Sequence, residues 1–279
     1  MDLRQRYSSD QWFLNMGWLF WIWYGIGAVL LLTVDVPKVL DFSNGLFLVF
    51  YALYALYLIY RAELYKEMSD QSVSSSTTPL WSRLILSGVI IWFGGMSLEW
   101  IGVHSGWPFG EYEYTSVLGA LIYGVPWTLG FAWIGVVAGG VLLSSSAKHA
   151  SAHTSALSNK GSYVLLHACK VGIWIIVLDL VLDPVAHARG FWHWEQTGGF
   201  YGVPWSNFVA WFVVGGLLSM VLPRLILTVR ILRHATFLYQ GMLLLFGLLA
   251  WQADIDGSMI VALIGILLAE GNYRYDTRR

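Results

Sequence analysis

Charged side chains are scarce in this chain of 279 residues. Aspartate, glutamate, lysine and arginine make up 12% of it, whereas hydrophobic residues make up 57%. Soluble domains carry about 25% charged residues, and a soluble fold of this size could not bury so much apolar surface. The formal net charge of −1 excludes a strongly basic surface, so nucleic acid is not expected as a partner. The scarcity of charge predicts an integral membrane protein.

Cysteine and the common cofactor motifs are also scarce or missing. Cys169 is the only cysteine, so no internal disulfide can form. The chain lacks a glycine-rich phosphate loop, a nucleophile elbow and a zinc-protease signature. His149 and His153 form one His-x-x-x-His pair, similar to the boxes of membrane di-iron desaturases, but those enzymes need several boxes. We therefore expect neither a bound metal nor a cofactor.

Long apolar runs dominate what is present. Eight runs come close to the roughly 20 residues that a helix needs to cross a bilayer. They cover 12–34, 42–60, 82–103, 117–143, 163–183, 206–229, 235–252 and 256–270. We expect an all-α integral membrane protein with a single polytopic domain over 1–279 and about eight transmembrane helices. The last two runs are short, so seven spans is the fallback. The first run is longer than a signal-peptide core and is expected to be a retained span.

The positive charges fall in alternate loops. If the N-terminus is cytoplasmic, all but three of the 16 Lys and Arg residues lie on the cytoplasmic side. Lys38 and Arg189 lie outside, and Lys170 lies within a span. Cytoplasmic loops retain Lys and Arg, so we expect a multi-pass protein of the cell membrane with both termini cytoplasmic. The outer loops are acidic and aromatic, which indicates that a polar site lies on that side.

Two stretches of the chain, about 82–143 and 163–229, resemble each other. Each predicts a span that rises to the outer face, an aromatic loop, and a span that returns. Such a parallel internal repeat of helical hairpins would have a pseudo-twofold axis along the membrane normal, and its two acidic positions would face each other. The first two matching pairs, Glu99 with Asp179 and Gly110 with Gly190, are both 80 residues apart. A two-residue deletion in the second stretch then aligns Gly124-Val125-Pro126-Trp127 with Gly202-Val203-Pro204-Trp205.

The acidic side chains within the spans are the strongest functional signal. Glu99 lies 16 residues beyond Arg83, or roughly 24 Å along a helix, which places it in the outer third of the membrane. Asp179 and Asp183 are four residues apart and share a helix face. Carboxylates at this depth are costly unless paired, wetted or protonated, so we predict that all three are catalytic. The alternatives are an interhelical hydrogen bond for Glu99 and Asp179, and a helix end at Asp183 before Pro184.

Aromatic side chains surround these acids along the chain. The 16 tryptophans exceed what the interfacial aromatic belt of a membrane protein needs. Aromatic rings beside buried acids can also stabilise a cation. The residues predicted to bind a substrate are Trp100, Tyr112, Tyr114, Trp192, Trp194, Tyr201 and Asn207.

These motifs resemble the CruF-type carotenoid hydratase family of integral membrane carotenoid-biosynthesis proteins. The resemblance covers 99–207 and departs mildly at Phe200 and Val203, where Tyr and Ile are expected. The matching pieces are Glu99-x-x-Gly102, Gly106-x-Pro108-Phe109-Gly110-x-Tyr112-x-Tyr114, Asp179-x-x-x-Asp183-Pro184, Gly190-x-Trp192-x-Trp194 and Tyr201-Gly202-Val203-Pro204-x-x-Asn207.

The resemblance implies addition of water to the terminal double bond of a linear (ψ) carotenoid end, without a redox cofactor. Glu99 and Asp179 would be the acid and base, in either order, and Asp183 would orient the water. The expected substrate is an acyclic or monocyclic carotenoid such as lycopene, γ-carotene or a bacterioruberin precursor. Other enzymes of the carotenoid pathway are candidate partners. The lipid bilayer is expected to surround the protein.

Other functions use similar features. A proton-coupled membrane transporter would also carry acids within its spans, but it needs a hydrated path through both leaflets. A non-catalytic carotenoid-binding membrane protein would tolerate replacement of the acids. An isoprenoid cyclase or isomerase would use the same acid chemistry. The sequence leaves open the identity of the carotenoid, whether one or both ends react, the order of the two acids, and the oligomeric state.

Overall fold

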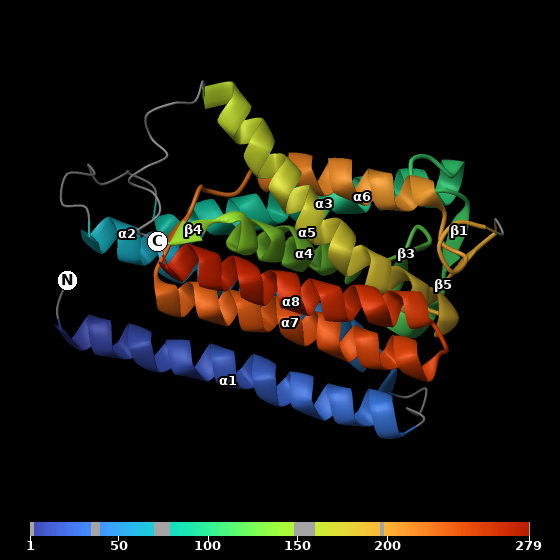
Figure 1. Cartoon of the computed structure of the whole chain (residues 1–279), viewed down its shortest axis with the longest axis horizontal. Helices are drawn as coiled ribbons and strands as arrows, with labels where there is room; N and C mark the ends of the chain where they lie inside the picture. Colours follow the sequence, from blue (N-terminus) through green and yellow to red (C-terminus); the bar gives the residue numbers. More distant parts are fainter. Residues whose placement is uncertain (1–2, 35–39, 70–78, 148–159, 196–197, 279) are drawn as a thin grey trace.

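The computed structural model is a bundle of α-helices, most of which run along its long axis while α5 crosses them at a tilt (Figure 1). It describes residues 3–34, 40–69, 79–147, 160–195 and 198–278. The all-α class predicted from the apolar runs is confirmed, and one helix corresponds to each run. Within the described residues the helices are α1 (Leu3–Thr33), α2 (Phe42–Ser69), α3 (Leu80–Ser105), α4 (Leu129–Ser144), α5 (Lys160–Ala188), α6 (Trp205–Ser219), α7 (Val229–Gln252) and α8 (Asp256–Arg278).

The outer surface of the bundle is strongly apolar. Four helices, α2, α3, α5 and α7, are long and apolar enough to cross a membrane. Large apolar side chains point outward, such as Leu267, which is 71% exposed, and Trp18, which is 65% exposed. Lipid accommodates such a surface and water does not. The protein is therefore a membrane protein, while the count of eight spans and their orientation stay predictions.

Two predicted spans are shorter as helices than the apolar runs suggested. The run 117–143 becomes helical only at Leu129, because Gly119 and Gly124 adopt positive φ and Pro126 lacks an N–H donor. The run 206–229 ends its helix at Ser219, ahead of Pro223. The intervening segments hold β1 (Tyr112–Tyr114), the 3₁₀ turn Ser116–Leu118, β2 (Leu121–Ile122), β3 (Val125–Pro126) and β6 (Ile226–Leu227).

Helix α5 continues through Pro184 to Ala188, so the expectation that Asp183 ends this helix is wrong. Proline normally leaves the carbonyl four residues earlier without its helical N–H partner. Here that carbonyl belongs to Leu180, and it accepts a hydrogen bond of 2.8 Å from Ser258 Oγ of α8. A neighbouring helix thus supplies the missing donor, which is how proline is tolerated in packed membrane helices.

A short antiparallel ladder joins the two halves of the chain at one end of the bundle (Figure 1). Strand β1 pairs with β5 (Trp192–Trp194), and Glu113 lies opposite His193. Backbone bonds extend the ladder on both sides, from Thr115 N to the Phe191 carbonyl at 3.0 Å and from Glu195 N to the Glu111 carbonyl at 2.9 Å. The remaining Cα partners across the ladder are Tyr112 with Trp194 and Tyr114 with Trp192.

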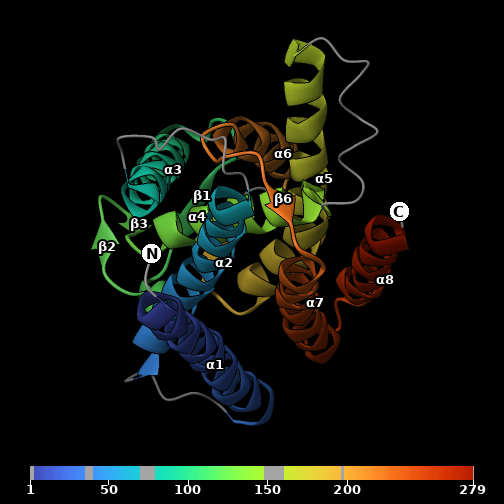
Figure 2. The same ribbon diagram turned by 90° about the vertical axis from the view of Figure 1, so that its left-hand side faces the viewer.

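Helix α4 lies inside the bundle, and nearly all its residues are buried (Figure 2). It packs against α6 through Trp133 and Trp211, whose rings stack at 3.9 Å with 7° between their planes. Gly95 of α3 makes room for this stack, because a Cβ atom there would lie 2.4 Å from the Trp133 ring. The core therefore centres on an aromatic contact between the two halves of the chain.

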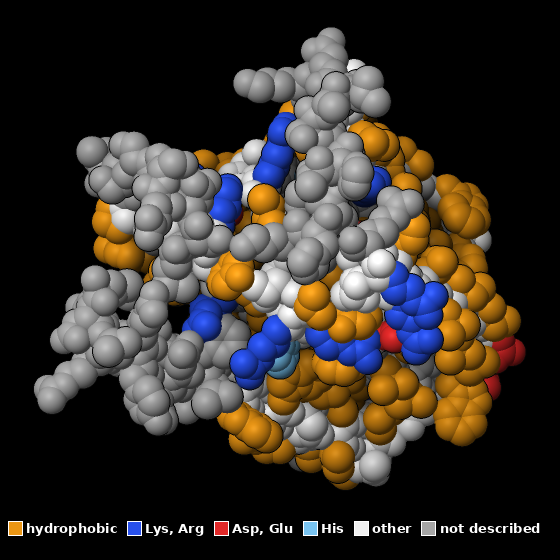
Figure 3. Space-filling model, turned by 60° about the vertical axis from the view of Figure 1, so that its left-hand side comes forward, with side chains coloured by type: hydrophobic (Ala, Val, Ile, Leu, Met, Phe, Trp, Pro, Cys, Tyr) orange, Lys and Arg blue, Asp and Glu red, His pale blue; other side chains and the backbone are white. Residues whose placement is uncertain are grey.

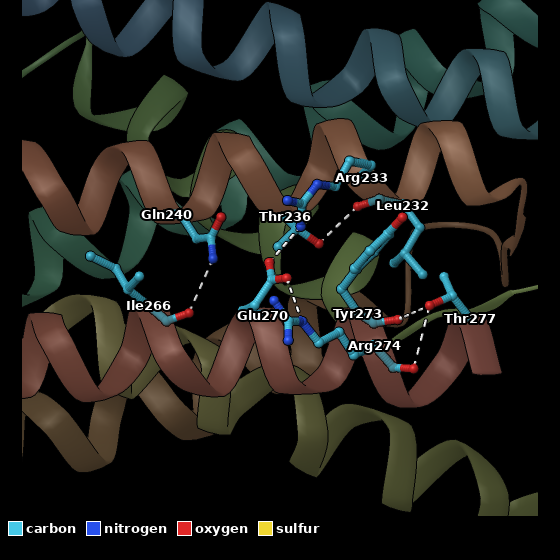
Figure 4. A network of polar contacts seen from close by, with 9 residues as sticks. All are labelled: Leu232, Arg233, Thr236, Gln240, Ile266, Glu270, Tyr273, Arg274 and Thr277. Carbon is cyan, nitrogen blue, oxygen red and sulfur yellow. Dashed lines mark hydrogen bonds and ion pairs between the residues drawn. The ribbon is translucent and has the colours of Figure 1, made fainter. Parts of the chain in front are cut away.

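Both chain termini lie at the opposite end of the bundle, and Lys and Arg side chains gather on that face (Figures 1 and 3). Short parallel strands β4 (Ser146–Ala147) and β6 pair there. Glu270 of α8 accepts hydrogen bonds from Arg233 of α7 and from Arg274 (Figure 4). The Arg233 guanidinium also lies over the Tyr273 ring, at 4.6 Å. This network fastens α7 to α8 away from the β1–β5 ladder.

Candidate active site

A cavity of about 240 Å³ lies inside the bundle beside the β1–β5 ladder. The three acids singled out from the sequence, Glu99, Asp179 and Asp183, all line it. The most exposed of the three, Asp179, is only 4% exposed. The predicted substrate-binding residues that also line it are Tyr112, Tyr114, Trp192, Trp194 and Asn207.

Glu99 of α3 is held by three neutral donors. Tyr112 Oη and Tyr114 Oη both donate to Glu99 Oε2, at 2.6 Å and 2.8 Å. Trp133 Nε1 donates to Oε1 at 2.9 Å. Gly102 permits this approach, because a Cβ atom there would lie 2.6 Å from Tyr112 Oη. Hydrogen bonds from three neutral donors favour the ionised form of a carboxyl group, against the cost of burying its charge.

The two tyrosines come from β1, outside the helices. Their alternation along the strand would put them on one face, and both reach Glu99. Burial raises the pKa of the Tyr112 and Tyr114 hydroxyls, and the neighbouring Glu99 carboxylate raises the pKa of each further. Both side chains therefore remain O–H donors at physiological pH.

Asp179 and Asp183 of α5 form the second acidic group. Asn207 Nδ2, in the first turn of α6, donates to Asp183 Oδ2 at 2.6 Å and to Asp179 Oδ2 at 3.2 Å. The two carboxyl groups lie about one helical turn apart on the same face of α5, close enough for each to affect the other electrostatically. The other oxygen, Asp183 Oδ1, is buried and accepts no N–H or O–H hydrogen bond from the described residues. Two buried carboxylates side by side repel each other, which favours a proton on one of them.

The two acidic groups line the same cavity, together with aromatic side chains. Glu99 interacts electrostatically with both Asp179 and Asp183, so the three carboxyl groups share one local field. Trp133, which holds Glu99, stacks on Trp211, which also lines the cavity. From the ladder, the Tyr112 and Trp194 rings pack at 4.7 Å, and the Tyr114 and Trp192 rings at 5.6 Å. An apolar ligand in this cavity would therefore be surrounded by a proton donor, a negative charge and aromatic rings.

Two residues predicted to bind the substrate do not line this cavity. Trp100 Nε1 donates to the Ile122 carbonyl at 2.9 Å and so braces a loop. As the residue after Glu99 it points about 100° away around the helix. Tyr201 is 43% exposed, and its hydroxyl accepts the Gly257 N–H at 2.9 Å. The pair His149 and His153 lies outside the described residues, as does Lys38.

Sequence reasoning missed Trp133 and Trp211. Their separation in the chain equals that between Gly124 and Gly202, so extending the alignment of the repeat into the returning spans finds them. It also missed the wall that α1 and α2 contribute to the cavity. No motif marks that wall, because most of its members are ordinary apolar residues and its polar members, Ser43 and Asn44, fall in no recognisable pattern.

Comparison with known proteins places the chain in a family. Residues 44–271 match the family described as carotenoid biosynthesis protein. Bisanhydrobacterioruberin hydratase from Haloarcula japonica is 34% identical over 121 residues, which are 43% of this chain. The matched segment spans only 38% of the length of that relative. No solved structure matches the chain.

The family match covers most of the chain and includes the cavity acids, both strands of the ladder and Asn207. It confirms the family that the motifs between Glu99 and Asn207 indicated. This chain belongs to the family of carotenoid biosynthesis proteins.

Proposed function

We propose that this protein is a carotenoid 1,2-hydratase, which adds water to the terminal double bond of an acyclic (ψ) carotenoid end group. The observation that carries the proposal is the meeting of three buried carboxyl groups in one apolar cavity. The relative from Haloarcula japonica is named a hydratase, which favours this chemistry over other reactions of the family.

The Asp179–Asp183 pair is the proposed proton donor. Glu99 accepts three hydrogen bonds from neutral donors, whereas the aspartate pair shares the single amide of Asn207. Three donors stabilise an anion, and a carboxyl pair in contact holds a proton. The proton most readily transferred therefore lies on the aspartate pair, and Glu99 remains the anion.

The reaction then proceeds in two steps. An O–H bond of the aspartate pair breaks as a C–H bond forms at the less substituted alkene carbon, which leaves a tertiary cation on the neighbouring carbon. A water oxygen adds to that cation, and the resulting oxonium loses a proton to the pair, which restores its starting state. Addition of water is neither an oxidation nor a reduction overall, so the proposed reaction requires no redox cofactor.

The cation between these steps needs stabilisation in an apolar site. Glu99 supplies a fixed negative charge, and the rings of Trp211, Trp192 and Trp194, which line the cavity, supply aromatic electron density. These groups are in place before the reaction begins, so little reorganisation is needed as charge develops.

The proposed substrate is an acyclic or monocyclic carotenoid of the lycopene, γ-carotene or bacterioruberin-precursor type. We place the protein in the cell membrane as a multi-pass protein with both termini cytoplasmic. The gathering of Lys and Arg at the end that holds the termini supports this orientation. The acids would then lie near the extracytoplasmic face.

We also propose that the two hairpins, about 82–143 and 163–229, are copies of one ancestral unit. Glu113 pairs with His193 at the offset of the first part of the repeat, and Trp133 stacks on Trp211 at the offset of its second part. A self-complementary contact between equivalent positions is the signature of a twofold relation. It supports the proposed pseudo-twofold axis through the ladder and the tryptophan stack.

Co-expression with a pathway that makes lycopene or γ-carotene tests the function. Mass analysis of the extracted pigments should show products heavier than the substrate by one or two waters. The matched control is Glu113→Gln, which alters an exposed acid on β1 and should leave the product unchanged. A pigment profile that stays unaltered across several acyclic substrates would contradict the proposal and favour a carotenoid-binding or transport role.

A further inference from the structure

Helix α1 is fastened to the bundle near its middle by aromatic contacts. The Phe20 side chain is 1% exposed and stacks on Tyr54 of α2 at 5.0 Å. Four residues later, Tyr24 Oη donates to the Gly241 carbonyl of α7 at 2.7 Å. These contacts hold α1 against both α2 and α7.

A second attachment lies near the end of α1, at backbone carbonyls. Gln252 Nε2, at the end of α7, donates to the Leu32 carbonyl at 2.8 Å. Arg189, just after α5, donates to the Leu31 carbonyl at 3.4 Å. Two attachments about two helical turns apart therefore bracket the segment from Gly25 to Leu30.

Between its attachments α1 forms one wall of the cavity that contains the acids. Ile26, Gly27 and Leu30 line it from α1, and Leu249 lines it from α7. This part of the cavity is mostly apolar, with Ser43 and Asn44 as its polar members from α2, and it belongs to the same cavity as the carboxyl groups. We call the part between the middle of α1, the start of α2 and α7 the polyene arm.

The cavity opens sideways at the polyene arm. Ile26 lines it and yet is 56% exposed, and Phe42 at the start of α2 lines it and is 54% exposed. On the α7 side, Leu245 and Leu249 are 1% and 2% exposed, so that wall is closed. The opening therefore lies between α1 and α2, on the flank of the bundle that would face lipid.

We propose that the polyene arm binds the conjugated chain of the carotenoid, which enters from the bilayer between α1 and α2 with its reactive end leading. This inference rests on the proposed function for the identity of the ligand. Only the terminal double bond has to reach the acids, and the rest of a long hydrocarbon needs an apolar wall with a lateral opening. The arm and its opening supply both.

Gly27 is the position at which the proposal can be tested. It lines the cavity, and a Cβ atom added there meets no atom within 4 Å. The Cβ atom of a leucine at 27 would therefore meet no clash, and we expect the rest of the side chain to extend into the arm. Gly25 is the matched control, because it also has nothing within 4 Å but does not line the cavity. Both changes replace a helical glycine with a better helix former.

The experiment measures binding of lycopene to the purified full-length protein in lipid nanodiscs, followed by quenching of tryptophan fluorescence. Trp23, Trp192, Trp194 and Trp211 line the cavity, so a bound polyene lies close to several indoles. Gly27→Leu should weaken lycopene binding roughly tenfold to hundredfold, the range expected for overfilling a packed site. Gly27→Ala should give a smaller loss, and Gly25→Leu should bind like the wild type. Equal affinities for Gly27→Leu and Gly25→Leu would overturn the polyene arm.

Hydration assayed on the same samples separates the two proposals. Lycopene binding that is sensitive to Gly27→Leu, together with no hydrated product from the wild type, would overturn the hydratase activity and leave the arm standing. Hydration by the wild type at a rate that Gly27→Leu does not change would overturn the arm and leave the hydratase standing.

Discussion

The two acidic groups of the cavity lie at positions that the proposed repeat aligns, but they are built differently. Glu99 of α3 receives two tyrosine hydroxyls and one indole N–H. Asp179 of α5 has a second carboxyl, Asp183, beside it and shares one amide with it. The first environment suits a lone negative charge, whereas the second suits two carboxyl groups that share a proton, as we propose. Two similar helical hairpins can thus supply an anion on one side of a ligand and an acid on the other.

The largest effect is expected from removing the proton donor. Asp179→Asn keeps the size of the side chain but replaces the carboxyl that we assign to proton transfer. Hydration should fall about 10³-fold, within the range by which general acid–base groups accelerate reactions. The rate of product formation, measured by mass analysis, checks this. A rate near that of the wild type would reverse the roles that we assign to the two acidic groups.

A smaller loss is expected from removing the anion. Glu99→Gln keeps an oxygen that can accept from Tyr112 and Tyr114 but removes the negative charge opposite the cation. Hydration should fall about 10²-fold, as for other groups that stabilise charge in the transition state, and lycopene binding should be retained. If Glu99→Gln is more damaging than Asp179→Asn in the same assay, Glu99 is the acid.

Removing one donor to Glu99 should lower stability more than activity. Tyr114→Phe deletes a buried hydrogen bond to a carboxylate, a type of bond that contributes about 1.5–3 kcal/mol. The free energy of unfolding in detergent should fall by about that amount. Tyr123→Phe is the matched control, because its side chain is 80% exposed. Equal stabilities of the two variants would show that Glu99 does not depend on its tyrosines.

The smallest effect concerns the helix that carries the aspartates. Ser258→Ala removes the donor to the Leu180 carbonyl that Pro184 leaves without its helical partner. Loss of this bond should cost about 1 kcal/mol of unfolding free energy, with activity slightly reduced. The matched control is Ser97→Ala, an exposed serine bonded to Phe93 of its own helix at 2.7 Å. An equal effect of both changes would show that α5 needs no donor from α8 at its proline.

Part of this molecule could be predicted from local patterns. Run length and hydropathy predicted a helix for each apolar run. The four-residue spacing of Asp179 and Asp183 predicted that they share one helix face, and both line the cavity. The motifs from Glu99 to Asn207 indicated the family that the comparison confirms. Hydropathy alone could not predict where two of the helices begin or end, because the chain remains apolar after glycine and proline have ended the helix.

Contacts between distant segments could not be predicted in the same way. Trp133 of α4 donates to Glu99 of α3 and stacks on Trp211 in the other half of the chain. Trp100 adjoins Glu99 in the chain, yet its indole braces a loop outside the cavity. The rotation and packing of the helices decide which aromatic ring reaches an acid. The number of tryptophans in the sequence cannot predict this.

The sequence by itself determined that this chain is apolar and helical and that Glu99, Asp179 and Asp183 fall within apolar runs, because hydropathy, helix period and spacing are properties of neighbouring residues. Only the tertiary structure decided that Glu99 is held by three donors, that Asp179 and Asp183 share an amide, and that α1 walls the cavity. Each of these depends on packing between segments that lie far apart in the chain, and such packing is set by the shape and closeness of side chains that no local pattern encodes.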